Sequence, residues 1–314
     1  IDNMRAALEK MGAPADLVQD VGIVSLEKTN ELMKQCDLIL ATGGAAMVGA
    51  AYSSGTPALG VGAGNAVITV DETADIVDAA EKIRISKTLD LAASCSADNS
   101  VIAVASIYDD LVEKLIAEGG HLAKEGDYEK IAAVLWEDGH LNTKAVVLKP
   151  QTLCEMAGVD IPADAKFIIM PETGTGPDHP YSGEKLSVIM AFYKVSDIDE
   201  AIALTNQIQD YQGKGHSCGI YSNSDDNILK MGMGTKTSRV MVNQPQAASN
   251  SGNLWNGMRQ TFSLGCGTWG GNSTNENINW KHLINVTWIS KPLDTPKVIP
   301  ADNELFGDVI ETLA

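Results

Sequence analysis

The sequence lacks the features that place a chain in a membrane or on a nucleic acid. No run of about 18 apolar residues occurs, so no membrane span is expected. Only 23 residues are Lys or Arg against 41 Asp or Glu, which gives a formal charge of -18. Nucleic acids and anionic membranes bind clustered cations, so we expect neither as a partner. The start of the chain also has no basic segment followed by an apolar one, as a targeting signal would have.

Cysteine is scarce, and its spacing argues against disulfides and metal binding. The chain has an odd number of cysteines, with no C-x-x-C pair and no histidine arranged beside them for zinc. We therefore expect free thiols in a reducing compartment, the cytoplasm, and no bound metal. The five cysteines are Cys36, Cys95, Cys154, Cys218 and Cys266.

The chain has the length and the patterning of an α/β protein. Its 314 residues, 44% of them hydrophobic, are enough for two domains with separate cores. Short apolar runs alternate with helical patterns, which indicates β-α-β units and a parallel sheet. Because the chain opens with Ile1 inside an amphipathic helical pattern, we also expect that an N-terminal portion precedes this sequence.

The same patterns give the bounds of the expected elements. Two strands are expected to begin just before residue 190 and just after residue 216. The other expected helices are 2–11, 26–34, 47–54, 71–87, 109–118, 128–135, 152–157, 197–211 and 305–313, and the other expected strands are 21–24, 37–41, 58–61, 66–70, 101–105, 145–147, 166–170, 239–243 and 280–290.

A turn of small residues surrounds Cys95, between the helical run and the strand at 101–105. Its neighbours Ser94, Ser96 and Ala97 leave the thiol open to a substrate, as a nucleophile requires. A free cysteine is more often a small buried apolar residue. This stretch alone leaves both interpretations open.

Glycine-rich turns follow two of the early strands. The turn Thr42-Gly43-Gly44 leads into a helix and presents free N–H groups to a phosphate or a cofactor ring. Any tight turn can use two glycines, however, and the full G-x-G-x-x-G pattern is absent. The second cluster, 60–64, holds three glycines in five positions, which a flat ligand lying on that face would explain.

Isolated polar residues supply further candidates. His216 stands before a strand and is either an acid or base or a structural residue. Glu184, also before a strand, could simply be solvated. Arg259 precedes the glycine-rich loop 264–272 and either pairs with a carboxylate or sulfonate of a substrate or forms a surface ion pair. Trp269, inside that loop, either plugs it or lines a site.

Taken in order, these pieces resemble the aldehyde dehydrogenase superfamily, and more closely its CoA-acylating branch. The resemblance implies parts of a Rossmann-like cofactor domain at 1–70, an α/β catalytic domain at 71–262, and a site loop with a C-terminal oligomerisation segment at 263–314. It also implies a homodimer or homotetramer. The motifs that carry it are Ala41-Thr-Gly-Gly44, the run 50–58, the run 60–65, Ser86-Lys-Thr with Cys95, Glu184-Lys-Leu-Ser187, Gly215-His216, and the run 264–272 with Glu276-Asn277.

The resemblance also implies a role for each candidate residue. Cys95 would be the nucleophile, His216 would assist an incoming thiol, and Glu184 would hold a ribose hydroxyl of NAD or NADP. Coenzyme A would be the cosubstrate. Residues facing the cofactor would be Thr42, Gly43, Gly44 and Met47, with Gly60, Val61 and Gly62 near the nicotinamide.

Gly60 departs from the pattern of the hydrolytic members, which carry a glutamate at the matching position. Without that carboxylate, water is poorly activated and an external thiolate is expected to take the acyl group. The sequence therefore predicts an oxidoreductase that makes acyl-CoA from a short aldehyde. The segment around Arg259 most resembles enzymes acting on sulfoacetaldehyde, then on succinate semialdehyde, then on acetaldehyde. A hydrolytic or phosphorylating semialdehyde dehydrogenase and a non-catalytic fragment or structural subunit are the alternatives.

Overall fold

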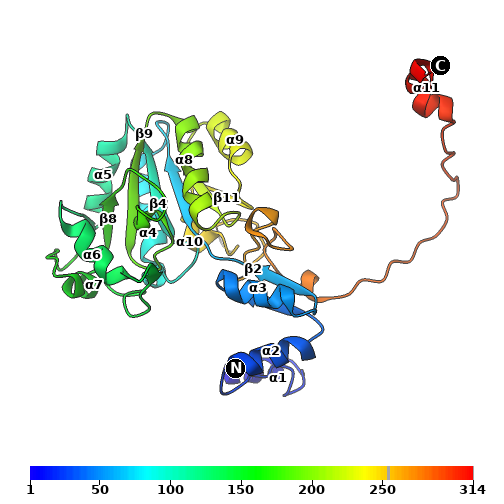
Figure 1. Ribbon diagram of the computed structural model, residues 1–314, viewed down its shortest axis with the longest axis horizontal. Helices are drawn as coiled ribbons and strands as arrows, with labels where there is room; N and C mark the ends of the chain where they lie inside the picture. The colour runs from blue at the N-terminus through cyan, green and yellow to red at the C-terminus, as the bar shows by residue number, and fades with distance from the viewer. Residues whose placement is uncertain (253–254, 314) are drawn as a thin grey trace. The chain divides into compact units, whose positions relative to one another are not determined.

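The structure is a computed structural model that describes residues 1–252 and 255–313 (Figure 1). The chain divides into two units, Ile1–Asn279 and Trp280–Ala314. The first unit contains the seven-stranded sheet, the two-stranded sheets and every predicted site residue. In the second, the 3-10 turn Trp280–Leu283 and helix α11, Asp302–Leu313, are the regular elements among the described residues.

The larger sheet has seven strands in the order β11-β10-β3-β4-β9-β8-β5, and all neighbouring strands are parallel. Parallel strands in the middle of a sheet are covered on both faces, so their sequences are continuous apolar runs. Every residue of β3 and β4 is accordingly buried. The strands are β3 Ala66–Val70, β4 Asp98–Val104, β5 Gly120–Leu122, β8 Phe167–Pro171, β9 Ile189–Val195, β10 Cys218–Tyr221 and β11 Val240–Val242.

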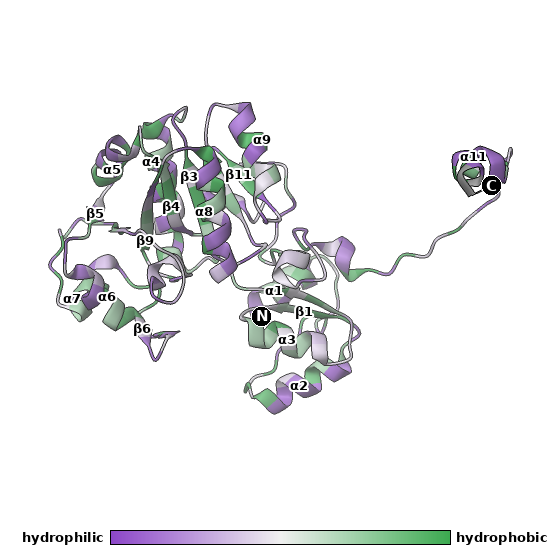
Figure 2. Ribbon diagram, turned by 45° about the horizontal axis from the view of Figure 1, so that its top comes forward, coloured by the Kyte–Doolittle hydropathy of each residue, from purple (hydrophilic) through white to green (hydrophobic). Residues whose placement is uncertain are grey.

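Helices pack on both faces of this sheet. Successive side chains of β4 point to opposite faces. Ile102 therefore joins one core, and Val101 joins the other. Figure 2 shows green hydrophobic strands flanked by helices that carry purple hydrophilic residues. The helices against the core of Ile102 are α6 Asp127–Leu135, α7 Pro150–Ala157, α8 Ile198–Tyr211 and α9 Asp225–Gly234, and those against the core of Val101 are α4 Ile76–Thr88 and α5 Tyr108–Ala117.

A second, two-stranded parallel sheet precedes the large one. It consists of β1, Ile39–Thr42, and β2, Ala58–Val61, joined by helix α3, Ala45–Ser53. Helices α1, Asp2–Lys10, and α2, Leu26–Gln35, come before it. The parallel α/β fold expected from the sequence is confirmed by these two sheets.

Three expected strands are wrong. At 21–24 the residues are exposed and pair with no strand among the described residues, so the backbone hydrogen bonds that define a strand are missing. At 145–147 the chain turns, because Val147 has a φ of 56°, in the left-handed region. At 280–290 a 3-10 turn is followed by exposed chain, with Trp288 90% exposed.

The start of helix α4 also differs from the expectation. It begins at Ile76 instead of residue 71, because the Asp75 side chain accepts hydrogen bonds from the Val77 and Asp78 N–H groups. Asp71 instead follows strand β3, and its carboxylate accepts from the N–H of Thr73 at 2.8 Å.

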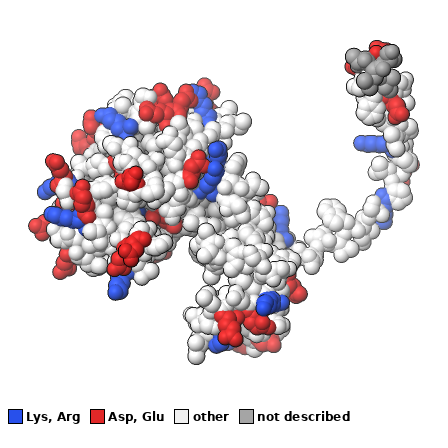
Figure 3. Space-filling model, viewed as in Figure 1, with Lys and Arg blue, Asp and Glu red and all other residues white. Residues whose placement is uncertain are grey.

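On the face shown in Figure 3, acidic and basic side chains are interspersed over the surface. Among the described residues, no helix is both long enough and apolar enough to span a membrane.

Candidate active site

The candidate residues stand at the amino ends of five neighbouring strands. Arg239 precedes β11, His216 precedes β10, Gly64 precedes β3, Cys95 precedes β4 and Glu184 precedes β9. Because these strands are parallel and adjacent in this order, their amino ends meet at one edge of the sheet. Residues far apart in the sequence are thereby gathered into one site.

Cys95 and His216 are in contact at this edge. Cys95 lies in the predicted turn after α4, and its Sγ is 3.2 Å from Nε2 of the fully buried His216. The other ring nitrogen, Nδ1, is 2.9 Å from Ser217 Oγ, which also accepts from Asn250 Nδ2 at 3.3 Å. A proton on Nδ1 satisfies this arrangement and leaves Nε2 as the acceptor for the thiol.

Burial keeps both groups uncharged. It raises the pKa of the Cys95 thiol to about 12, and the negative charges of Glu184 and Cys266 raise it further. It lowers the pKa of His216 to about 3, with Arg239 as a second cause. At neutral pH the site therefore holds a thiol whose sulfur lies within hydrogen-bond distance of the free Nε2 of a neutral imidazole, which is the geometry of a nucleophile and its base.

Gly64 brings Glu184 beside the nucleophile. A Cβ on Gly64 would lie 2.2 Å from the Cys95 carbonyl oxygen, so only glycine allows this approach. The N–H of Gly64 faces the Glu184 carboxylate and favours its charged form, whereas burial raises the pKa of that carboxyl to about 7. The next residue, Lys185, donates its backbone N–H to Asn99 Oδ1 on β4 at 3.2 Å. Glu184 is thus fixed against the strand that follows Cys95.

The glycine-rich loop 264–272 joins the site through Asn272. Its Oδ1 accepts from the N–H of Gly62 at 3.3 Å and from that of Cys266 at 2.9 Å. Neither Asn272 nor Arg239 was predicted as a site residue. For Asn272, its place at the end of a glycine-rich run was a usable signal of a role in the site. For Arg239, nothing in the neighbouring sequence indicates such a role.

The predicted cofactor residues lie on the neighbouring strands β1 and β2. Thr42 is the last residue of β1 and Gly43 and Gly44 follow it, and the Gly43 N–H donates to the carbonyl of Val61 on β2 at 3.2 Å. Met47 is on the first turn of α3, and with Thr42 it lines a cavity of about 530 Å³. Gly62, with Tyr52, Cys266 and Trp269, lines a second cavity of about 460 Å³.

The start of α3 fits a phosphate group. Its N-cap residue, Gly44, offers no side-chain hydrogen bond to the first turn, and a Cβ there would meet nothing within 4 Å. The helix therefore presents free backbone N–H groups to open space, where a dinucleotide's pyrophosphate can bind.

Gly60 is packed against α3. A Cβ on it would lie 2.6 Å from Val48 Cγ1 and 2.7 Å from Tyr52 Oη. Its own N–H donates to Tyr52 Oη at 3.0 Å. A glutamate side chain has no room at this position.

Arg259 lies apart from these residues. Its side chain is exposed and lines none of the cavities described above. Its backbone carbonyl accepts from Asn277 Nδ2 at 2.9 Å. Residues 253 and 254, in the segment that leads to it, lie outside the described residues. Its role toward a substrate stays a prediction.

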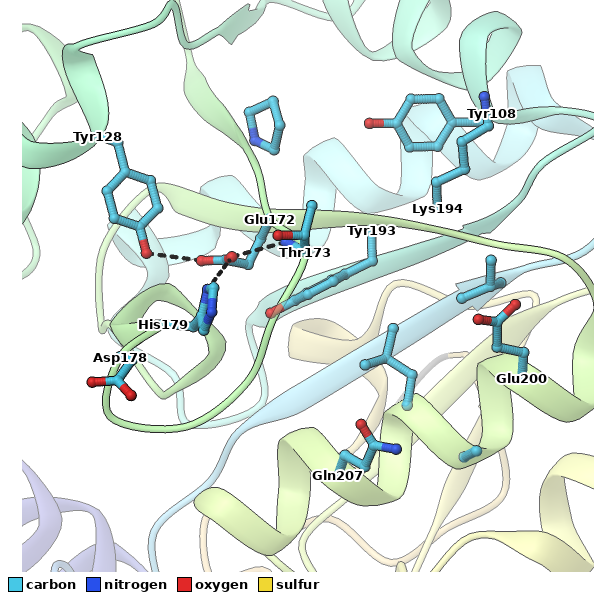
Figure 4. Close-up of a pocket in the computed structure, with 14 residues that line it drawn as sticks. Tyr108, Tyr128, Glu172, Thr173, Asp178, His179, Tyr193, Lys194, Glu200 and Gln207 are labelled. Carbon is cyan, nitrogen blue, oxygen red and sulfur yellow. Dashed lines mark hydrogen bonds and ion pairs between the residues drawn. The ribbon is translucent and has the colours of Figure 1, made fainter.

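A further cavity, of about 650 Å³, lies at the carboxyl ends of β8 and β9, the edge of the sheet opposite Cys95 (Figure 4). Its central carboxylate, Glu172, accepts from Tyr128 Oη at 2.9 Å and from the Thr173 N–H at 2.8 Å. His179 Nδ1 lies 2.7 Å from the same carboxylate. Because these polar groups bind one another, we do not include this cavity in the site.

The comparisons with known proteins agree with this picture. No model of a known protein family matches the chain. A sulfoacetaldehyde dehydrogenase from an Acholeplasma species is 44% identical over 315 residues, covering 99% of this chain and 64% of that protein. A sulfoacetaldehyde dehydrogenase (acylating) from Bilophila wadsworthia is 40% identical over 313 residues, covering 98% and 67%. The chain thus spans about two thirds of the length of these relatives.

Among solved structures, an acetylating aldehyde dehydrogenase from Geobacillus thermoglucosidasius superposes with a TM-score of 0.88 at 36% identity, covering 93% of this chain and 66% of that one. The fold is therefore that of an aldehyde dehydrogenase. Within that class, the chain belongs to the acylating aldehyde dehydrogenases. The resemblance drawn from the sequence motifs is confirmed.

Proposed function

We propose that this protein is a CoA-acylating aldehyde dehydrogenase, which oxidises a short aldehyde with NAD or NADP and passes the acyl group from Cys95 to coenzyme A. The observation that carries the proposal is the 3.2 Å contact between Cys95 Sγ and His216 Nε2. The relatives support the rest. A solved propionaldehyde dehydrogenase from Rhodopseudomonas palustris contains bound propionyl-CoA, and an engineered glycolyl-CoA reductase contains bound NADP+.

The first step joins Cys95 to the aldehyde. Its Sγ bonds to the carbonyl carbon while the π electrons of the C=O bond move to the carbonyl oxygen, and the S–H proton passes to Nε2 of His216. Transfer during attack avoids a free buried thiolate, and passing the same proton on to the new oxygen of the adduct restores the neutral imidazole that burial favours. Ser217 keeps the ring oriented through Nδ1.

The nicotinamide cofactor fits the residues already described. The residues that would hold it are Thr42, Gly43, Gly44, Met47, Gly60, Val61 and Gly62, and the carboxylate of Glu184 would bind a ribose hydroxyl. When bound, the cofactor supplies the hydride acceptor that the oxidation of the Cys95 adduct to a thioester needs.

Release of the acyl group favours a thiol over water. Because Gly60 has no space for a carboxylate, no side chain at that position can activate water. The thiol of coenzyme A attacks the thioester carbon, its proton passes by way of His216 to the Cys95 sulfur, and the bond from that carbon to Cys95 breaks, which leaves acyl-CoA and the free Cys95 thiol. Hydrolysis is the second candidate, because the Glu184 carboxylate is close enough to Cys95 to raise its pKa.

For the substrate we infer a short anionic aldehyde, with sulfoacetaldehyde first. Two relatives at 44% and 40% identity carry that name, and a succinate-semialdehyde dehydrogenase (acetylating) from Clostridium kluyveri is 38% identical. Acetaldehyde is the third choice. Arg259 would bind the anionic group. We also infer a homodimer or homotetramer in the cytoplasm.

Product analysis tests the proposal. The protein is given NAD or NADP and a panel of short aldehydes, with and without coenzyme A, and reduced nicotinamide and products are measured. We expect acyl-CoA when coenzyme A is present, and an acyl adduct on Cys95 by mass spectrometry when it is absent. Rapid accumulation of free acid with no adduct would instead support hydrolysis. A Cys95 that iodoacetamide alkylates no faster than the buried Cys154 would indicate a non-catalytic chain.

A further inference from the structure

Arg239 is a buried cation at the edge of the sheet that carries the site. Only 6% of the residue is exposed. Its guanidinium donates to three backbone carbonyls: Nη1 to His216 at 2.7 Å, and Nη2 to Gly265 at 2.8 Å and to Asn275 at 3.2 Å. One side chain therefore ties the residue in contact with Cys95 to the start of the glycine-rich loop and to the segment that follows this loop.

These bonds use three of the five N–H donors of Arg239 and leave its charge uncompensated. Among the described residues, no carboxylate forms an ion pair with it, and the ionisable groups that favour its charged form are the thiols of Cys266 and Cys95. A buried charge without a counter-charge is costly, and proteins retain one where it serves an anion. The anions that act on Arg239 are therefore those two thiolates.

The geometry of a guanidinium suits this position. Its planar fork presents donors in fixed directions and can bridge His216 to Gly265, which come from separate segments of the chain. A lysine ammonium carries the same charge as a single point and cannot keep all three bonds. Charge and geometry can therefore be tested separately at this residue.

We propose that Arg239 is a positioning residue of the site, which holds His216 and the glycine-rich loop around Cys95 and supplies the positive charge that stabilises the Cys95 thiolate. The proposal rests on the role of Cys95 given above. His216 contacts the Cys95 sulfur, and the charges of Glu184, Cys266 and Arg239 act on it. Arg239 lowers the pKa of that thiol, against the rise caused by burial, Glu184 and Cys266.

Alkylation of Cys95 tests this without aldehyde, cofactor or coenzyme A, so the outcome does not depend on the overall reaction. The variants are R239K, which keeps the charge, and R239M, which loses it, both with C266S so that only one of the two facing thiols remains. Iodoacetamide labelling of the Cys95 peptide is followed by mass spectrometry from about pH 7 to about pH 10. Because the thiolate is the reactive form, the rate reports its population.

We expect Cys95 in R239M to be alkylated about tenfold more slowly at each pH, because a rise of about one unit in the pKa of the thiol lowers the thiolate population about tenfold. In R239K we expect alkylation to slow by less than about threefold. A purely structural role predicts the reverse, because loosening the site would expose Cys95 and speed its labelling. Equal rates in R239M and its parent, faster labelling in R239M, or equal slowing in R239K and R239M would overturn the proposal. If R239M exposes the buried Cys154, R239Q replaces it, since an amide can still donate to the carbonyls.

Discussion

Cys95 Sγ lies 3.2 Å from His216 Nε2 across 121 positions of sequence, and burial leaves both groups uncharged. The two residues meet because β4 and β10 flank β3 in a parallel sheet, which places their amino ends side by side. The nucleophile is therefore protonated in the resting site and loses its proton only when an acceptor takes that proton during the reaction. This relationship makes the imidazole indispensable to the first chemical step.

Replacing His216 with alanine removes the proton acceptor of Cys95. We expect formation of the Cys95 acyl adduct to slow by about 10²- to 10⁴-fold, the usual contribution of a general base. Ser217→Ala removes only the hydrogen-bond partner of His216 Nδ1 and should slow adduct formation by less than about tenfold. Quenched single-turnover mass spectrometry without coenzyme A measures the adduct. The exposed His140 gives the matched control, since H140A should leave the rate unchanged. An H216A rate within threefold of the parent would contradict this role.

Glu184 should make the reactivity of Cys95 depend on pH in a particular way. Burial raises the pKa of this carboxyl to about 7, so the group is mostly neutral below that pH and charged above it. Its negative charge raises the pKa of the Cys95 thiol. E184Q should therefore speed alkylation of Cys95 at least about threefold near pH 8.5, and the ratio to the parent should approach one near pH 6.

The same substitution separates the two roles of Glu184. If the carboxylate also binds a ribose hydroxyl, E184Q raises the KM for the nicotinamide cofactor while it speeds alkylation. Glu172, a buried carboxylate at the opposite edge of the sheet, provides the control, since E172Q should leave Cys95 alkylation unchanged. A ratio that does not vary with pH would show that the charge of Glu184 does not act on the thiol.

Gly60 should tolerate no side chain. The Cβ of G60A would lie 2.6 Å from Val48 Cγ1, so we expect a loss of about 1 to 3 kcal/mol in the free energy of unfolding from overpacking. In G62A the nearest heavy atoms are 3.9 Å away, and the loss should stay within about 1 kcal/mol. Urea denaturation measures both. G60E should also fail to produce a hydrolytic enzyme, and rapid formation of free acid by G60E would refute the packing argument.

Much of the fold could be predicted from the sequence because each central strand is an apolar run bounded by polar turns. Strands β2 and β3 have the predicted bounds, and the turn that holds Cys95 lies where it was expected. The strand predicted at 21–24 failed because its β-branched residues have no partner strand among the described residues, and pairing is not a local property. Arg239 was missed for a similar reason: its partners, His216 and Gly265, are adjacent only once the strand order is known.

Arg259 gives a prediction about substrate choice. If its guanidinium holds the anionic end of the aldehyde, R259M should raise the KM for sulfoacetaldehyde and succinate semialdehyde and leave that for propionaldehyde unchanged. The side chain is exposed, and exposed ion pairs contribute at most about 1 kcal/mol, so we expect an increase of no more than about fivefold. Steady-state kinetics on the three aldehydes measures this. An equal loss on all three would dismiss the assignment.

Lys87 and Asp98 are two buried groups of opposite charge that act on one another electrostatically, with no direct ion pair between them among the described residues. Both are fully buried, and each shifts the pKa of the other toward its charged form, against the larger effect of burial. Removing one charge should leave the other unpaired, so K87M should lower the free energy of unfolding by about 3 to 5 kcal/mol. The double variant K87M/D98N removes both charges and should recover more than half of that loss.

The control is Lys82, on the same helix, which forms a surface pair with Asp78. K82M should lower the free energy of unfolding by about 0.5 kcal/mol or less. Urea denaturation at neutral pH of the parent, K87M, D98N, K87M/D98N and K82M completes the comparison. Additive losses from K87M and D98N would mean that the two charges do not stabilise one another, and the pairing would then be wrong.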